Sequence, residues 1–243
     1  MNAIAIQNLT FTYDDGTCAI DAVSLDIDIG ESVGIVGANG AGKSTFVNHL
    51  NGFYLPQSGE ISVFGHVLTK KTQEEIRRMV GLVFQNADDQ LFMARVYDDV
   101  MFGPQNLGIS GDALHALVDT TLKELSLWDL RDKPPSHLSA GQKRFCAFAT
   151  VLVMKPQLLV MDEPTSDLDP RHRRQLINMV RSLDTTKITV SHDLDFIWEI
   201  CERTIIMDNG KVVADGASKE ILSSQKLLEM HGLELPLRLQ RYN

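Results

Sequence analysis

Cysteine is scarce in this chain of 243 residues, and its few thiols lie far apart in the sequence. Cys18, Cys146 and Cys201 are odd in number and show no C-x-x-C spacing, so we expect neither a disulfide framework nor a zinc site. A reducing compartment is the simplest account of isolated thiols, and we assign them no chemistry.

Long apolar runs are lacking too. The longest, Phe145 to Met154, is ten residues, well short of the roughly 20 that a membrane-spanning helix requires. The opening MNAIAIQNLT does not resemble a signal peptide, so we expect the protein to stay in the compartment where it is made. If it works at a membrane, another protein is expected to anchor it there.

An excess of basic charge is the third absence. The formal net charge is -9, whereas broad binding to a phosphate backbone needs surplus Lys and Arg to displace counterions. We therefore expect no nucleic-acid partner. Low-complexity tracts and internal repeats are absent as well, and the 44% hydrophobic and 23% charged residues indicate an ordinary globular protein.

Short apolar runs alternate with helix-like stretches, which predicts an α/β fold with a mainly parallel sheet. The runs are Val33 to Gly37, Leu158 to Asp162 and Lys187 to Ser191, and helical patterns begin at Gly42, Pro170 and Leu194. Period-two alternation in Ser24 to Ile29, and an edge-strand pattern in Glu60 to Phe64, add an N-terminal antiparallel β subdomain.

Strand signals vanish between about residues 86 and 156, where leucines recur three and four positions apart. This periodicity predicts an inserted α-helical subdomain. We therefore expect one domain, 1–243, with the core and antiparallel subdomain in 1–85 and 157–217, the helical subdomain in 86–156, and a helical tail in 218–243. Within the tail, Lys219 to Leu228 is expected to be one amphipathic helix that ends near Gly232.

A phosphate-binding loop follows the first of these runs. Gly37-Ala38-Asn39-Gly40-Ala41-Gly42-Lys43-Ser44, followed by Thr45, fits the pattern G-x-x-x-x-G-K-[ST]. A strand enters the loop and a helix leaves it, so backbone N–H groups and the positive helix end converge on phosphate oxygens. Lys43 is expected to reach the β- and γ-phosphates and Ser44 to ligate Mg²⁺.

Two adjacent carboxylates end the apolar run at residues 158–162. Asp162 occupies the expected position of a residue that organises Mg²⁺ at the carboxyl end of a strand. Glu163, the next residue, is well placed to polarise a water for attack on the γ-phosphate. A nucleotide and Mg²⁺ are therefore the expected ligands, with Glu163 as the candidate catalytic base. The phosphate loop alone leaves kinases, GTPases and helicases open.

The order of the motifs resembles the ABC ATPase family, because Leu138-Ser139-Ala140-Gly141-Gln142 matches its L-S-G-G-Q signature except at Ala140. The resemblance covers about residues 4 to 216. In family order, the matches are Tyr13, the phosphate loop, Gln85, the signature, Asp162 with Glu163, Ser166-Asp167-Leu168-Asp169, and His192. The resemblance implies a nucleotide-binding core of the P-loop NTPase type.

The family's residue roles carry over to matching positions. Tyr13 is expected to stack on adenine, and Gln85 to ligate Mg²⁺ beside Ser44 and Asp162. His192 is expected to contact the γ-phosphate and hold the attacking water with Glu163. Ser139, Gly141 and Gln142 are expected to face the nucleotide of a second ATPase subunit, so a dimer, by preference a homodimer, sandwiches two ATP molecules. Ala140 in place of glycine and Asp167 in place of a small residue favour slower hydrolysis.

The segment from Val83 to Pro104 resembles the ATPases of energy-coupling factor importers. The resemblance implies an ATPase at the cytoplasmic face of the plasma membrane, which couples ATP-driven dimer closure to solute uptake. Its expected partners are a membrane coupling subunit of the T type and a substrate-binding membrane subunit. The tail Met230 to Pro236 resembles the cobalt or nickel branch.

Four aspartates in this segment, Asp88, Asp89, Asp98 and Asp99, are hypothesised to help form a groove for basic coupling helices. The alternative for them is a solvated acidic loop. For the whole chain, the alternatives are an importer of a vitamin such as biotin, a soluble ABC ATPase acting on nucleic acid or ribosomes, and a regulatory subunit without turnover.

Overall fold

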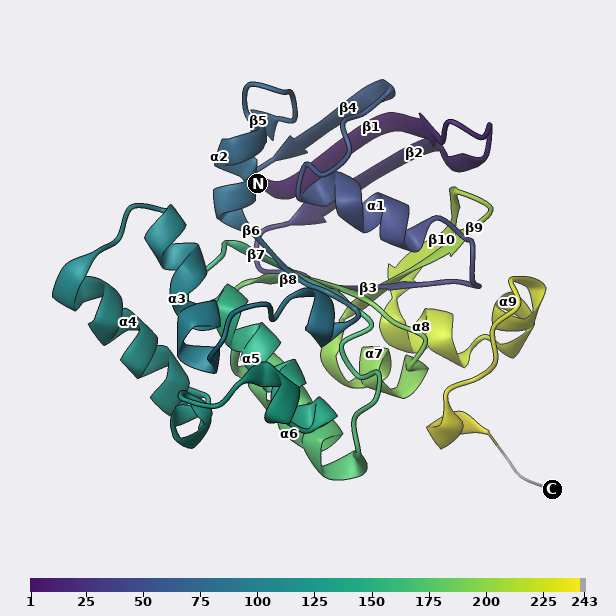
Figure 1. Ribbon diagram of the computed structural model, residues 1–243. Helices are drawn as coiled ribbons and strands as arrows, with labels where there is room; N and C mark the ends of the chain where they lie inside the picture. Colours follow the sequence, from purple (N-terminus) through teal and green to yellow (C-terminus); the bar gives the residue numbers. More distant parts are fainter. Residues whose placement is uncertain (241–243) are drawn as a thin grey trace.

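The computed structural model describes residues 1–240 and contains two β-sheets with helices around them (Figure 1). The last three residues of the predicted tail, 241–243, lie outside the described residues. The strands are β1 Asn2–Thr12, β2 Cys18–Asp28, β3 Ser32–Val36, β4 Ser58–Val63, β5 His66–Val67, β6 Val80–Val83, β7 Leu158–Asp162, β8 Thr186–Val190, β9 Arg203–Asp208 and β10 Lys211–Ala217.

Helices connect most of these strands. They are α1 Lys43–Leu50, α2 Gln73–Met79, α3 Val96–Asn106, α4 Gly111–Glu124, α5 Ala140–Leu152, α6 Pro170–Ser182, α7 Leu194–Ile200, α8 Ser218–Ser223 and α9 Gln225–Met230. Short 3₁₀ turns occur at Ala87–Asp89, Trp128–Leu130, Pro135–His137 and Leu237–Leu239. Within residues 1–240, no helix is both long and apolar enough to cross a membrane.

The larger sheet has the strand order β10-β9-β3-β8-β7-β6, and all of its strands are parallel except β10, which pairs antiparallel with β9. The smaller sheet, β2-β1-β4-β5, is antiparallel. The α/β fold with an N-terminal antiparallel sheet is thus confirmed. Residues 86–156 contain helices and 3₁₀ turns only.

The parallel strands are apolar on both faces because both faces are covered. In β7, Leu158 and Val160 pack with α1 and the smaller sheet, whereas Leu159 and Met161 pack with the helices of the opposite side. Helix α1 lies between the two sheets, and α5, α6 and α7 lie below the larger one (Figure 1). Helix α5 also contributes Cys146 and Ala149 to a third cluster, shared with α3 and α4, and Val153, the residue directly after the helix, belongs to the same cluster.

Two local predictions were wrong. The segment predicted as an edge strand, Glu60 to Phe64, falls in β4, which lies between β1 and β5, because the two-residue β5 covers its outer side. The predicted single tail helix is divided into α8 and α9 at Ser224, whose ψ of 87 is not helical. Leu222 and Leu228 are both fully buried, so packing of each short helix against the core outweighs a continuous helix.

Candidate nucleotide site

The candidate site lies at one edge of the larger sheet. Strands β3, β8, β7 and β6 are neighbours and parallel, so their carboxyl ends meet there. The phosphate loop follows β3, Asp162 and Glu163 end β7, His192 follows β8, and Gln85 follows β6. Sheet topology therefore brings together residues that are up to 155 positions apart (from Gly37 to His192).

The phosphate loop turns sharply at Gly42, where φ is 97. A Cβ at this position would lie 2.2 Å from the carbonyl oxygen of Ala19, so only glycine fits. Helix α1 begins at the next residue, Lys43, whose Nζ donates hydrogen bonds to the carbonyl oxygens of Gly37 at 2.7 Å and Ala38 at 2.9 Å. The ammonium is thereby held within the loop that is expected to receive phosphates.

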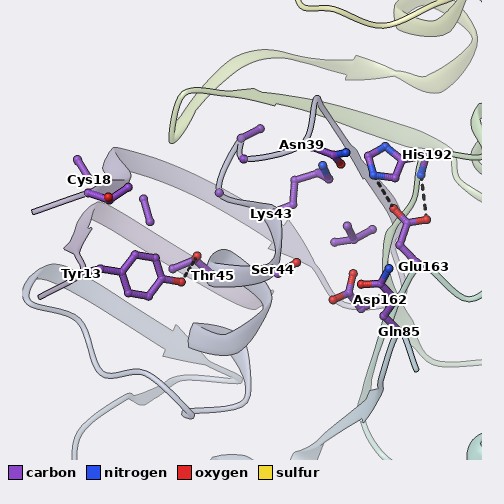
Figure 2. Close-up of a pocket in the computed structure, with 16 residues that line it drawn as sticks. Tyr13, Cys18, Asn39, Lys43, Ser44, Thr45, Gln85, Asp162, Glu163 and His192 are labelled. Carbon is purple, nitrogen blue, oxygen red and sulfur yellow. Dashed lines mark hydrogen bonds and ion pairs between the residues drawn. The ribbon is translucent and has the colours of Figure 1, made fainter. Parts of the chain in front are cut away.

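A cavity of about 310 Å³ opens over this loop. Its wall combines the loop with the ends of β6, β7 and β8 and with the segment between β1 and β2, as Figure 2 shows. The lining residues are Tyr13, Thr17, Cys18, Ala19, Asn39, Gly40, Ala41, Gly42, Lys43, Ser44, Thr45, Gln85, Asp162, Glu163, Val190 and His192. Of the residues predicted to contact nucleotide within one subunit, only Gly37 and Ala38 of the loop are missing from this wall, and both of their carbonyls accept hydrogen bonds from Lys43.

The predicted adenine platform lies at one end of the cavity. Tyr13 is 36% exposed, and its hydroxyl is hydrogen-bonded to Oγ1 of Thr45 at 2.7 Å (Figure 2). The ring also contacts Phe11 edge to face, with centroids 5.2 Å apart. Both contacts fix the ring while leaving part of it open to a ligand. Its stacking on adenine stays a prediction.

The acidic end of the cavity suits a divalent cation. Burial and the neighbouring Glu163 charge raise the pKa of Asp162, and Lys43 and Ser44 oppose this shift. Burial lowers the pKa of the Lys43 ammonium, against the pull of both carboxylates. Two crowded carboxylates gain from a cation, and the carboxylate, hydroxyl and amide oxygens of Asp162, Ser44 and Gln85 are ligands that Mg²⁺ prefers. The residues present therefore fit the predicted magnesium site.

Glu163 is held tightly beside this end. It is 7% exposed, with a left-handed φ of 46. Its Oε2 accepts hydrogen bonds from Ser191 Oγ and from the His192 backbone N–H, both at 3.1 Å. Its Oε1 approaches His192 Nε2 to 3.3 Å without the geometry of a hydrogen bond, and has no hydrogen-bond partner within residues 1–240. One buried carboxylate oxygen is therefore free to accept a proton.

The signature residues do not reach this cavity in the same chain. Ser139 caps α5, and its side chain and that of Gln142 exchange hydrogen bonds with each other's backbone N–H. Gly141 is buried against the ring of His172, whereas Ala140 is exposed at the first position of the helix. Asp167 is exposed in a left-handed conformation, with φ of 62. The action of the signature on a second subunit's nucleotide stays a prediction.

The four aspartates of the hypothesised partner groove do not form one acidic surface. Asp99 was wrongly assigned to it, because it is 3% exposed and accepts hydrogen bonds from the backbone N–H groups of Phe92 and Met93 at 3.0 Å. Asp98 pairs with Arg95 at 2.8 Å, and Asp88 pairs with Lys143 of α5 at 2.6 Å. Asp89 is exposed. For Asp99, hydrogen bonds to these two backbone N–H groups outweighed solvation.

The sequence analysis missed two residues that support the site. Arg144, on α5, is 4% exposed and donates to the backbone carbonyls of Phe84 at 2.7 Å and Gln85 at 2.6 Å. Ser191 is fully buried against Glu163. An arginine at the start of an apolar helix is a usable signal for the first. The second depends on pairing between distant strands and has no local signal.

Comparisons with known proteins agree with this geometry. Residues 20–166 match the family described as "ABC transporter". The chain is 50% identical over 240 residues, covering 98% of each protein, to a putative ABC transporter ATP-binding protein of Gloeobacter violaceus. It is 45% identical over 238 residues, covering 97% of this chain and 88% of the relative, to the energy-coupling factor transporter ATP-binding protein EcfA of Carboxydothermus hydrogenoformans.

A solved structure is similar as well. The CbiO1 protein of Clostridium perfringens, part of the ABC transporter complex CbiONQ, superposes with a TM-score of 0.82 at 36% identity, covering 94% of each chain. Family model, relatives and fold all agree with the motif order along the sequence. The chain therefore belongs to the ABC transporter family as one of its ATPases, and within the family it resembles the energy-coupling factor type.

Proposed function

We propose that this ATPase works with Mg²⁺ as half of a dimer, and drives solute import through membrane subunits of the energy-coupling factor type. The observation that carries the hydrolytic part is Oε1 of Glu163, which is buried beside the phosphate loop and Asp162, lies 3.3 Å from His192 Nε2 and accepts no hydrogen bond within residues 1–240. A buried acceptor at this point takes a proton from a water aimed at the γ-phosphate.

The other residues have complementary tasks. Bound Mg²⁺ would neutralise charge on the β- and γ-phosphates, and Ser44, Gln85 and Asp162 would hold it. Lys43 lies where it would exchange its bonds to Gly37 and Ala38 for phosphate oxygens. His192 has a half-exposed ring, 49% of its side chain, and so reaches from Glu163 toward a bound nucleotide.

Glu163→Gln tests the hydrolytic proposal. The amide keeps the shape of the side chain but is no base, so we expect ATP hydrolysis to fall by about 100-fold or more while ATP binding persists. Phosphate release and binding of a fluorescent ATP analogue, measured with excess Mg²⁺, give the two quantities. Equal hydrolysis by both proteins would refute Glu163 as the base and leave a regulatory role without turnover.

The proposed contact with the membrane subunit lies over the loop after β6 and helix α3. Phe92 is 62% exposed and Phe102 39%, and their rings meet edge to face with centroids 5.1 Å apart. Asp88 and Asp89 lie on the same loop. Apolar rings beside acidic groups suit a coupling helix that is partly apolar and carries basic residues.

Charge reversal tests this contact. We expect the double change Asp88→Lys with Asp89→Lys, and separately Phe92→Asp, to abolish co-purification with the membrane subunit while ATP binding stays normal. Asp184→Lys, an exposed site between α6 and β8, is the matched control and should assemble normally. Normal assembly of both test proteins would remove this surface from the proposal.

The solute is proposed to be a cobalt or nickel ion. This finer proposal rests on the resemblance of the tail Met230 to Pro236 to that branch, and on the similarity to CbiO1. Cells that produce the chain with its co-purifying membrane subunits should accumulate radioactive cobalt or nickel in an ATP-dependent manner. Accumulation of a labelled vitamin such as biotin instead would overturn it.

A further inference from the structure

Strand register places a serine against the proposed catalytic base. Strands β7 and β8 are parallel, and Asp162 pairs with Val190 at their carboxyl ends. Glu163 directly follows β7, and Ser191 directly follows β8. The Glu163 backbone N–H donates to the Val190 carbonyl at 2.8 Å. Ser191 is fully buried and does not line the nucleotide cavity, so it lies behind the carboxylate.

The direction of the Ser191 hydrogen bonds is fixed by its neighbours. The backbone N–H of Asp193 donates to Ser191 Oγ at 3.1 Å, which uses the oxygen as an acceptor. The hydroxyl proton is then directed to Oε2 of Glu163, also at 3.1 Å. A hydroxyl can accept one hydrogen bond while it donates another.

The two oxygens of Glu163 thereby become unequal. Oε2 is occupied by Ser191 Oγ and the His192 N–H, whereas Oε1 has no hydrogen-bond partner within the described chain. Figure 2 shows the carboxylate turned toward His192, with one oxygen near the ring and the other near the backbone nitrogen. Rotation of the carboxylate would cost both bonds to Oε2, so the free oxygen keeps its direction.

We infer that Ser191 is a positioning residue for ATP hydrolysis, which locks Oε2 of Glu163 and presents Oε1 to the attacking water. This inference rests on the proposed role of Glu163 and deepens it. A carboxylate that is held in one rotamer needs less reorganisation when it accepts a proton. Ser191 itself does not line the nucleotide cavity, so its effect is expected to pass through Glu163.

Steady-state ATP hydrolysis by four full-length variants tests the inference. Ser191→Ala removes only the hydroxyl, and Ser191→Thr keeps it. Thr189→Val removes another buried hydroxyl from the same strand, two residues earlier, and is the matched control. Glu163→Gln is measured alongside. Thermal unfolding of each variant reports whether a change in rate reflects loss of the fold.

We expect the loss of the Ser191 hydroxyl to slow turnover and to leave ATP binding nearly unchanged. Ser191→Ala should lower kcat about tenfold, the effect of losing one hydrogen bond to a charged group, with KM for ATP changed less than twofold. Ser191→Thr should recover most of kcat, and Thr189→Val should resemble the wild type. If the threonine variant does not fold, Ser191→Ala alone tests the inference: kcat should fall while KM stays nearly unchanged.

Three outcomes would overturn the inference: a kcat for Ser191→Ala equal to that of Thr189→Val, equal losses in folded Ser191→Ala and Ser191→Thr, or a raised KM at unchanged kcat. The control variant Glu163→Gln separates this failure from failure of the proposed function. If the Glu163→Gln protein is inactive and the Ser191→Ala protein has normal activity, only the role inferred for Ser191 is refuted. A fully active Glu163→Gln removes the catalytic base and the positioning role together.

Discussion

Arg144 links three elements through its guanidinium alone. It donates to the carbonyls of Phe84 and Gln85, at the end of β6, and more weakly to that of Ser166 at 3.5 Å. Burial lowers the pKa of its guanidinium, and Asp167, Asp162 and Glu163 oppose the shift. These carbonyls have a charged hydrogen-bond partner. The loop that presents Gln85 to the nucleotide cavity is therefore held in place by Arg144 of α5, the helix that begins within the signature.

Arg144→Ala is predicted to destabilise the protein by about 2 to 3 kcal/mol, because two partly buried carbonyls lose a charged donor. We also expect a higher Mg²⁺ requirement for hydrolysis, since Gln85 is released. Urea unfolding measures the first effect, and hydrolysis against Mg²⁺ concentration measures the second.

Lys143→Ala is the control one residue earlier. Its ammonium pairs with Asp88, which is 61% exposed, and such surface pairs contribute about 0 to 1 kcal/mol. Equal losses of unfolding free energy in the two variants would contradict the role given to Arg144.

At the scale of elements, the starts of α5 and α6 are in direct contact. A Cβ added at Gly141 would lie 2.7 Å from Cγ of His172, whose Nδ1 is hydrogen-bonded to Asp169 at 2.5 Å. Asp169 also caps α6 by accepting from the backbone N–H groups of Arg171 and His172. The signature and the Ser166-to-Asp169 segment are therefore joined through one imidazole ring.

A double-mutant cycle tests this junction. Gly141→Ala should destabilise the protein by about 1 to 3 kcal/mol, because the new methyl group overlaps the ring. The same change in a His172→Ala background should cost clearly less, since the alanine leaves room. Unfolding free energies of the four proteins give the coupling. Additive losses would show that the residues at positions 141 and 172 do not interact, and would contradict the junction.

At the scale of the whole molecule, one chain holds only part of the expected ATP site. The cavity contains the phosphate loop, both carboxylates and His192, whereas Ser139 and Gly141 lie at the start of α5, outside its wall. The positive amino end of a helix suits a phosphate, and a second copy is the simplest source of one.

We therefore predict that the Glu163→Gln protein, which cannot consume ATP, dimerises when ATP and Mg²⁺ are added. Light scattering should give twice the 27.0 kDa of the chain, and removal of Mg²⁺ with EDTA should return the monomer. Ser139→Glu in the same background places a negative charge against the partner's phosphates, so it should stay monomeric with normal ATP binding. A dimer in its presence would exclude the signature from the interface.

Much of the site was predictable because its parts are local. The phosphate loop, the Asp162–Glu163 pair and the caps of α5 and α6 each occupy a few consecutive residues, and backbone geometry alone orients their groups. Runs that are buried on both faces identified the parallel strands in the same way. Both ends of β7 and the first residues of α6 and α7 agree with those expectations.

The tertiary structure decided what local patterns leave open. The burial of Asp99, the division of the tail at Ser224, and the contacts of Arg144 and His172 all depend on which distant surface covers each residue. The sequence by itself was enough to predict a nucleotide site at the loop from Gly37 to Ser44, and to propose Glu163 as its base. Only the register of β7 against β8 decided that Ser191 holds this base, because side-chain contact between strands requires a pairing that neither strand encodes alone.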